Sequence, residues 1–169
     1  CLVTGQTAPI ARLHPAIKGV QGAQSSGASL VAFNATAFES YGHELADKTG
    51  QGLNAPVSES AAFAYGTVLN RLLADREHVQ YIGDTTVVYW AEDAERSYQD
   101  LFHAAFFSAQ DEIITQRELN GVLHKIAAGQ EIDVNGIPIN PKNNFYILGL
   151  APSAARLSVR FSLMNTFNG

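Results

Sequence analysis

Acidic residues are missing from both ends of this chain. No Asp or Glu occurs in residues 1–38 or in residues 134–169, where the formal charges are +2 and +3. The middle of the chain, with six cations and sixteen acids, carries −10. If the two end segments pack side by side, they form a basic, carboxylate-free face of the kind that binds phosphate. The alternative is that acids are simply depleted from buried strands.

Cysteine and long apolar runs are also scarce. The single cysteine, Cys1, excludes an internal disulfide and indicates a reducing, cytoplasmic setting. Five scattered histidines offer no metal-ligand spacing, so we expect neither a metal nor another cofactor. No apolar run is long enough to span a bilayer and no signal peptide is visible, so we expect no membrane partner.

The chain has the length and composition of one globular domain. Its 169 residues, 46% of them apolar, suffice for a single well-packed core, and we expect residues 1–169 to form one domain. The chain opens with CLVTG, without an initiator methionine and directly with strand-like residues. We therefore expect it to be an excerpt of a longer multidomain protein.

Hydrophobic periodicity predicts a mixed α/β or α+β fold with three main helices and about five strands, in an order that the sequence does not decide. The helices are expected at 58–75, 94–107 and 111–128, and the strands at 28–33, 78–82, 85–90, 144–150 and 156–163, with the end of a further strand at 1–4. Ser58 is a suitable N-cap for the first helix, which Gly66 weakens slightly. Gly83 and Asp84 predict a hairpin turn.

The first helix is expected to be amphipathic. Its predicted apolar face is made by Ala62, Tyr65, Val68, Leu69 and Leu72. One helical turn is also expected near residues 38–41, and a loop at 50–56.

A glycine-rich polar loop precedes the strand predicted at 28–33. It contains three glycines, four neutral hydrogen-bonding side chains and one cation, and no acid: Gly19, Gly22, Gly27, Gln21, Gln24, Ser25, Ser26 and Lys18. A flexible polar loop held by a rigid strand is a common way to present recognition groups. Such side chains donate to and accept from base edges, and glycine-rich backbone approaches phosphates closely.

Two catalytic motifs match this loop only in part. Gly22 and Gly27 have the spacing of a phosphate-binding P-loop, but Ala28 stands where the lysine belongs and a strand follows instead of a helix. Ser25 and Ser26, with His14 or His43 as base, suggest a serine hydrolase. The spacing is not that of a nucleophile elbow, and serines in such loops usually cap turns.

Four carboxylates around the predicted strand 85–90 suggest a metal-dependent nuclease as a further alternative. They are Asp84, Glu92, Asp93 and Glu95. Carboxylates near the end of a strand suit such a metal site. No lysine follows Glu92 at the spacing of a nuclease motif, and the simpler interpretation is the solvated start of the next helix.

Two arginines on the last predicted strand fit a nucleic-acid surface. Arg156 and Arg160 are four residues apart, so they lie on one face of the strand and both can contact a phosphate backbone. The alternative is an ordinary surface loop with arginines extended into solvent. The residues alone do not decide between these two interpretations. A purely structural protein-interaction module remains a further alternative.

Four blocks together resemble a known family. Residues 13–42 (LHPAIKGVQGAQSSGASLVAFNATAFESYG), 53–73 (LNAPVSESAAFAYGTVLNRLL), 82–92 (IGDTTVVYWAE) and 145–163 (FYILGLAPSAARLSVRFSL) are similar to the large subunit of the subtype I-C (Dvulg) CRISPR Cascade surveillance complex. They occur in the family's order and cover more than half of the chain. Members of that family are roughly three times longer, so the resemblance implies an internal fragment of the amino-terminal region.

The resemblance implies a non-enzymatic role in RNA-guided antiviral defence. Such subunits bind the duplex beside the target, help to recognise the protospacer-adjacent motif and hold the opened strands. Their partners are double-stranded and opened target DNA, the guide RNA complex, other Cascade subunits, and a helicase-nuclease recruited after target binding. On this basis we expect a DNA-facing surface made by Arg12, Lys18, Gln21, Gln24, Ser25, Ser26, Asn34, Arg156 and Arg160.

Overall fold

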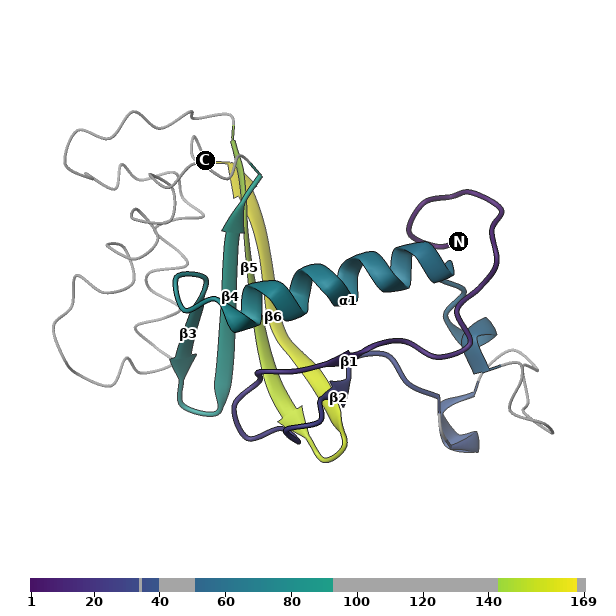
Figure 1. Cartoon of the computed structure of the whole chain (residues 1–169), viewed down its shortest axis with the longest axis horizontal. Helices are drawn as coiled ribbons and strands as arrows, with labels where there is room; N and C mark the ends of the chain where they lie inside the picture. Colours follow the sequence, from purple (N-terminus) through teal and green to yellow (C-terminus); the bar gives the residue numbers. More distant parts are fainter. Residues whose placement is uncertain (34, 40–50, 93–142, 167–169) are drawn as a thin grey trace, which may run out of the picture. The chain divides into compact units, whose positions relative to one another are not determined.

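A computed structural model describes residues 1–33, 35–39, 51–92 and 143–166 of the chain (Figure 1). These ranges contain one α-helix, two short 3-10 helices and six strands, so the predicted mixed α/β class is confirmed. Packing divides the chain into two compact units, residues 1–74 with 152–158 and residues 75–151 with 159–169. No helix in the described ranges is long and apolar enough to cross a membrane.

Helix α1 (Glu59–Ala74) is the main helix of the first unit and confirms the helix predicted at 58–75. Ser58 caps it as expected, because the Ser58 Oγ accepts a hydrogen bond of 3.2 Å from the Ala61 amide. The buried residues of the helix are Ala62, Gly66, Leu69 and Leu73. The predicted apolar face was therefore only partly right, since Val68 is 56% exposed.

Gly66 has a structural role that the sequence did not reveal. A Cβ built on this glycine would lie 2.2 Å from Cγ of Pro15, well inside van der Waals contact. The missing side chain therefore lets the segment before the first strand pack directly against the helix. The prediction that Gly66 merely weakens the helix omitted this contact.

Three strand segments pair in the first unit. Strand β1 (Ala16–Ile17) is antiparallel to β2 (Ala28–Ser29), and Ser29 pairs in parallel with Arg156, the first residue of β6 (Arg156–Thr166). The strand predicted at 28–33 is thus wrong beyond Ser29. The Phe33 carbonyl illustrates why, because it accepts a hydrogen bond of 3.1 Å from the Gln51 side chain instead of a strand partner.

The chain begins with a turn and not with the predicted strand end. The Gly5 amide donates to the Cys1 carbonyl at 2.9 Å, which closes the turn. Leu2 and Val3 are 71% and 68% exposed, so their apolar character reflects no buried strand. A 3-10 helix, η1 (Thr36–Phe38), shares only residue 38 with the helical turn expected near 38–41, of which residues 40 and 41 lie outside the described residues. Part of the loop expected at 50–56 forms a second 3-10 helix, η2 (Gln51–Asn54).

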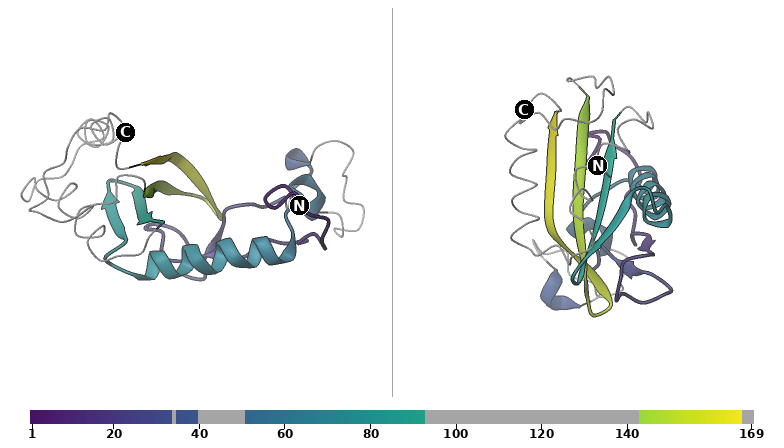
Figure 2. Two further views of the ribbon diagram at one scale, coloured as in Figure 1. Left: turned by 90° about the horizontal axis from the view of Figure 1, so that it is seen from above. Right: turned by 90° about the vertical axis from the view of Figure 1, so that its left-hand side faces the viewer.

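Four strands of the second unit pair in the order β6-β5-β4-β3, where β3 is Val79–Ile82, β4 is Thr85–Ala91 and β5 is Asn144–Ser153 (Figures 1 and 2). The hairpin predicted at Gly83 and Asp84 is confirmed, because Ile82 pairs with Thr85 across this two-residue turn and Gly83 has a φ of 58°. Strands β4 and β5 are antiparallel, with Val88 opposite Leu148.

The core of the second unit lies on strands β4 and β5. Val87, Val88 and Tyr89 on β4 are at most 1% exposed, as are Phe145, Ile147 and Leu150 on β5. Because neighbouring residues of β4 point to opposite faces of the sheet, the strand is covered on both sides. Burial, and secondarily the negative charges of Asp75 and Glu77, raise the pKa of Tyr89 to about 12.

The helices predicted at 94–107 and 111–128 lie outside the described residues. The prediction of a single domain also stays a prediction, because the two units are defined by internal packing alone.

Candidate nucleic-acid interface

The polar loop between β1 and β2 has a defined backbone. Gly19, Gly22 and Gly27 all have positive φ, and two short turns are closed by hydrogen bonds from Ala23 to the Val20 carbonyl (3.2 Å) and from Gly27 to the Gln24 carbonyl (2.9 Å). Val20 is 5% exposed and anchors the loop. The side chains predicted to recognise DNA are exposed: Lys18, Gln21, Gln24, Ser25 and Ser26.

Gly27 is the residue that closes this loop against β1. Its φ is 101°, and an added Cβ would lie 2.9 Å from the Ala16 Cβ and 3.1 Å from the Ile17 carbonyl oxygen. Only glycine fits such a position without strain. The loop therefore returns tightly onto the strand that it leaves.

Asn70 of α1 fastens the start of the loop to the helix. Its Oδ1 accepts a hydrogen bond of 2.7 Å from the Lys18 amide, and its Nδ2 donates to the Ala16 carbonyl at 3.1 Å. One side chain thus satisfies an acceptor of β1 and a backbone donor of the residue that follows it. Nothing in the sequence pattern singled out Asn70, because its contacts are 52 and 54 residues away along the chain.

The two acid-free ends of the chain meet beside this loop. Ser29 pairs with Arg156, the Ser29 amide donates to the Ala155 carbonyl at 3.4 Å, and a Cβ on Gly22 would lie 3.3 Å from Cγ of Pro152. The structure therefore brings residues 22–29 and 152–156 together within the first unit, which is the condition on which the interpretation as a basic face depended.

Arg156 is held by an aromatic ring. Its Cζ lies 3.7 Å from the centroid of Phe38, the distance of a cation–π contact. No carboxylate in the described part of the chain forms an ion pair with Arg156, so its charge is not neutralised there. The sequence did not indicate Phe38 as a partner, since only the fold brings these two distant residues together.

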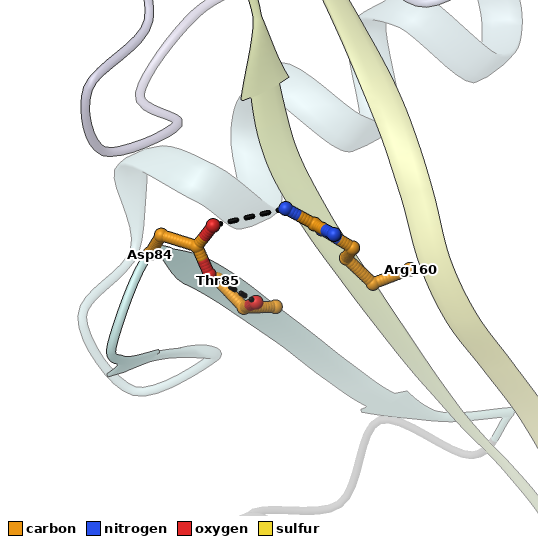
Figure 3. Close-up of polar contacts among 3 residues, drawn as sticks. All are labelled: Asp84, Thr85 and Arg160. Atoms are coloured by element: carbon orange, nitrogen blue, oxygen red, sulfur yellow. Dashed lines mark hydrogen bonds and ion pairs between the residues drawn. The ribbon is translucent and has the colours of Figure 1, made fainter. Parts of the chain in front are cut away.

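Arg160 has a different environment, in the second unit. Its Nη2 lies 2.9 Å from Oδ2 of Asp84, and the other oxygen of this carboxylate, Oδ1, accepts a hydrogen bond of 3.2 Å from the Thr85 hydroxyl (Figure 3). Both side chains of the ion pair are more than half exposed, at 52% and 69%. Such an exposed ion pair contributes about 0–1 kcal/mol to stability, so Arg160 can exchange Asp84 for another anionic partner at little cost.

Arg12 lies apart from the polar loop. Its Nη1 donates to Oε1 of Gln51 at 3.0 Å, and the same amide group of Gln51 donates to Phe33, as described above. The guanidinium is thus bound by a neutral side chain. Asn34, the remaining residue of the predicted surface, lies outside the described residues.

For the metal-dependent nuclease alternative, the described residues include two of the four candidate carboxylates, Asp84 and Glu92. Asp84 and Glu92 flank the two ends of β4, so the seven residues of an extended strand, about 23 Å, lie between them and they cannot share a metal ion. In the described ranges no three His, Cys, Asp or Glu side chains form a potential metal site. Asp93 and Glu95 lie outside those ranges.

For the serine hydrolase alternative, the described residues include one of the two candidate bases, His14. The Nδ1 of His14 lies 2.7 Å from the Tyr65 hydroxyl and not from a serine, and burial lowers the pKa of His14. Burial also raises the pKa of Tyr65, so its hydroxyl is protonated where it shares the hydrogen bond with His14 Nδ1. His43 lies outside the described residues.

The fold and the candidate surface define a mixed α/β protein with a carboxylate-poor polar loop and no assembled catalytic centre in its described part. Residues 1–169 match the profile of the family described as CRISPR-associated protein (Cas_Csd1), and the chain belongs to this family. Membership supports a role as a Cascade large subunit in CRISPR defence and implies partnership with other Cascade subunits and the guide RNA complex. No curated protein matches the chain.

Proposed function

We propose that this chain is the non-catalytic DNA-binding part of a Cascade large subunit of subtype I-C, and that it acts in the cytoplasm. It contributes to recognition of the protospacer-adjacent motif and to holding the opened strands. A helicase-nuclease then acts on the captured target. The observation that carries this proposal is the contact between the polar loop and the start of β6, which gathers the acid-free ends of the chain in one unit.

Within this surface the charged and neutral residues have different tasks. Lys18 and Arg156 bind phosphate oxygens, which fixes the position of the duplex without reading its sequence. Gln21, Gln24, Ser25 and Ser26 lie on the turns of the loop, where their side chains reach base edges. The contributions of phosphate contacts and of base readout to DNA binding can therefore be separated by mutation.

Arg160 provides a second phosphate contact in the proposal, made by the second unit. Phosphate competes there with Asp84 for an exposed guanidinium. Arg12 is not included among the proposed phosphate contacts, because its guanidinium is bound to Gln51 beside apolar side chains.

The test measures target DNA binding by the assembled complex, containing the full-length subunit, across a range of salt concentrations. Lys18→Ala and Arg156→Ala are each expected to reduce the slope of log affinity against log salt by about 0.9. Arg71→Ala is the matched control, because Arg71 is an exposed cation of the same unit on α1 and is not part of the surface. Equal slopes for all four proteins would refute the proposed surface.

Base readout is tested with a panel of targets that differ only in the adjacent motif. Gln24→Ala is expected to reduce discrimination among these motifs while the salt slope stays unchanged, since a neutral side chain releases no counterion. A uniform loss of affinity across the panel would contradict the assignment of this loop to readout.

A further inference from the structure

A shallow groove in the first unit is separate from the polar loop. It has a volume of about 310 Å³ and lies between residues 11–15 and the first turns of α1. Its apolar lining includes Leu13, Pro15, Ala62 and Phe63, and Arg12 and Glu59 provide charged groups at its border. A groove of this size accommodates one or two side chains of a ligand.

Two large apolar side chains of the groove are exposed to solvent. Phe63 is 72% exposed and Leu13 is 59% exposed. Helix α1 packs through other residues, Ala62, Gly66, Leu69 and Leu73, so the exposed ring of Phe63 is not needed to hold the helix in place. Exposed aromatic and aliphatic side chains beside a groove are typical of a surface that a partner covers.

The charges at the groove are not equivalent. Glu59 is in the first turn of α1, where the helix dipole favours a carboxylate, so the helix itself accounts for its presence. Arg12 donates only to the neutral Gln51, and no carboxylate in the described ranges forms an ion pair with it. The groove therefore presents an uncompensated cation next to apolar walls.

From this combination we infer that the groove binds an extended segment of another protein subunit of the complex. A large apolar side chain of that segment lies between Leu13 and Phe63, and a neighbouring Asp or Glu pairs with Arg12. Nucleic acid fits less well, because the lining is mainly apolar and offers few groups that pair with phosphates or base edges. The inference assigns Arg12, predicted from the sequence to contact DNA, to a protein carboxylate instead.

The occupant is identified by site-specific photocrosslinking in the assembled complex. The photoreactive residue p-benzoylphenylalanine replaces Phe63 in the full-length subunit, and crosslinked peptides are identified by mass spectrometry. The expected product joins residue 63 to another protein subunit, at a peptide with an Asp or Glu within a few residues of a large apolar residue. The same probe at Val68, which is 56% exposed on the same helix but outside the groove, is expected not to label that peptide.

Substitutions then test whether this contact contributes to binding. Phe63→Lys and Arg12→Glu are each expected to weaken retention of the subunit in the complex by about tenfold or more, as for the central residues of an interface. Val68→Lys is the control for a lysine on an exposed helix position and should leave retention unchanged. Arg12→Glu should be rescued when the acidic residue of the crosslinked peptide is changed to Arg, which a folding defect would not allow.

Other occupants would overturn the inference. Crosslinks from residue 63 to DNA, to guide RNA, to a second copy of this chain, to a distant part of the same chain, or to nothing each contradict a partner subunit. Equal retention of the Phe63→Lys and Val68→Lys subunits in the complex would also contradict a partner subunit at the groove. Because these measurements concern subunit retention, they remain informative even if the salt dependence of DNA binding refutes the proposed DNA surface.

Discussion

Replacing Gly66 by alanine tests the packing of the first unit most directly. In the interior of an exposed helix, Gly→Ala stabilises the helix by about 1 kcal/mol, because alanine loses less backbone entropy. Here the new Cβ would lie 2.2 Å from Cγ and 2.9 Å from Cβ of Pro15. Carbon atoms pack at about 3.5–4.0 Å, so the proline ring or the helix must move by more than about 1 Å.

The expected result is destabilisation in spite of the better helix propensity. Overpacking of this kind costs about 1–3 kcal/mol, and the proline ring cannot rotate away because it is closed on its own backbone. We expect the upper part of this range, so the net loss after the gain in propensity is about 1–2 kcal/mol.

The assay is hydrogen exchange of the α1 amides in the full-length subunit, which measures the free energy of opening this helix. Ala64→Gly, at an exposed position of the same helix, gives the propensity effect alone and should cost about 1 kcal/mol. Pro15→Ala combined with Gly66→Ala should remove the closest contact, with Cγ of Pro15, and restore part of the stability beyond the sum of the single effects. Stabilisation by Gly66→Ala alone would refute the packing argument.

Three further predictions concern the loop, the second unit and its ion pair. Gly27→Ala should increase hydrogen exchange throughout residues 18–29, because the residue has a φ of 101° and its Cβ would lie 2.9 Å from the Ala16 Cβ; unchanged exchange would contradict this. The pKa of Tyr89 is raised to about 12, so the unfolded state releases this proton first. The contribution of Tyr89 to the unfolding free energy should therefore be constant below about pH 10 and fall from there to about pH 12, so Tyr89→Phe should show a smaller fall over this range, as followed by denaturant titration at each pH. Asp84→Asn should increase the salt slope of target binding by about 0.9 or less, because it leaves Arg160 available to phosphate; an unchanged slope would separate Arg160 from the DNA surface.

The sequence predicted best the elements whose signals are local. The cap at Ser58, the Gly83-Asp84 turn and the β-branched run in 85–90 depend on neighbouring residues, and the structure confirms the helix and hairpin that they indicate. Strands β5 and β6 also begin at the predicted residues, 144 and 156, but they extend past the predicted ends at 150 and 163 to residues 153 and 166.

Elements that depend on distant partners were predicted less well. Residues 28–33 have the apolar composition of a strand, but only Ala28 and Ser29 pair with other strands. The exposed Leu2 and Val3 likewise have strand-like character without a partner. Composition indicates that a segment can form a strand, but only the availability of an unpaired neighbour decides that it does.

The candidate site shows the same limit. The charge pattern led to the contact between the polar loop and the start of β6, since both segments lack acids. The contacts that position it, from Asn70 to the Lys18 amide and from Phe38 to Arg156, join residues far apart in the chain. The different surroundings of Arg12 and Arg160 arise in the same way, from Gln51 and Asp84.

The double hydrogen bond of Asn70 makes the amide group itself irreplaceable. Aspartate has nearly the same shape but presents only acceptors to the Ala16 carbonyl, and leucine presents neither a donor nor an acceptor. Asn70 lies seven residues, about 10 Å along the helix axis, from Phe63 on the same helix. Helix α1 therefore joins the groove, through Phe63, to the start of the polar loop, through the bond from the Lys18 amide to Asn70.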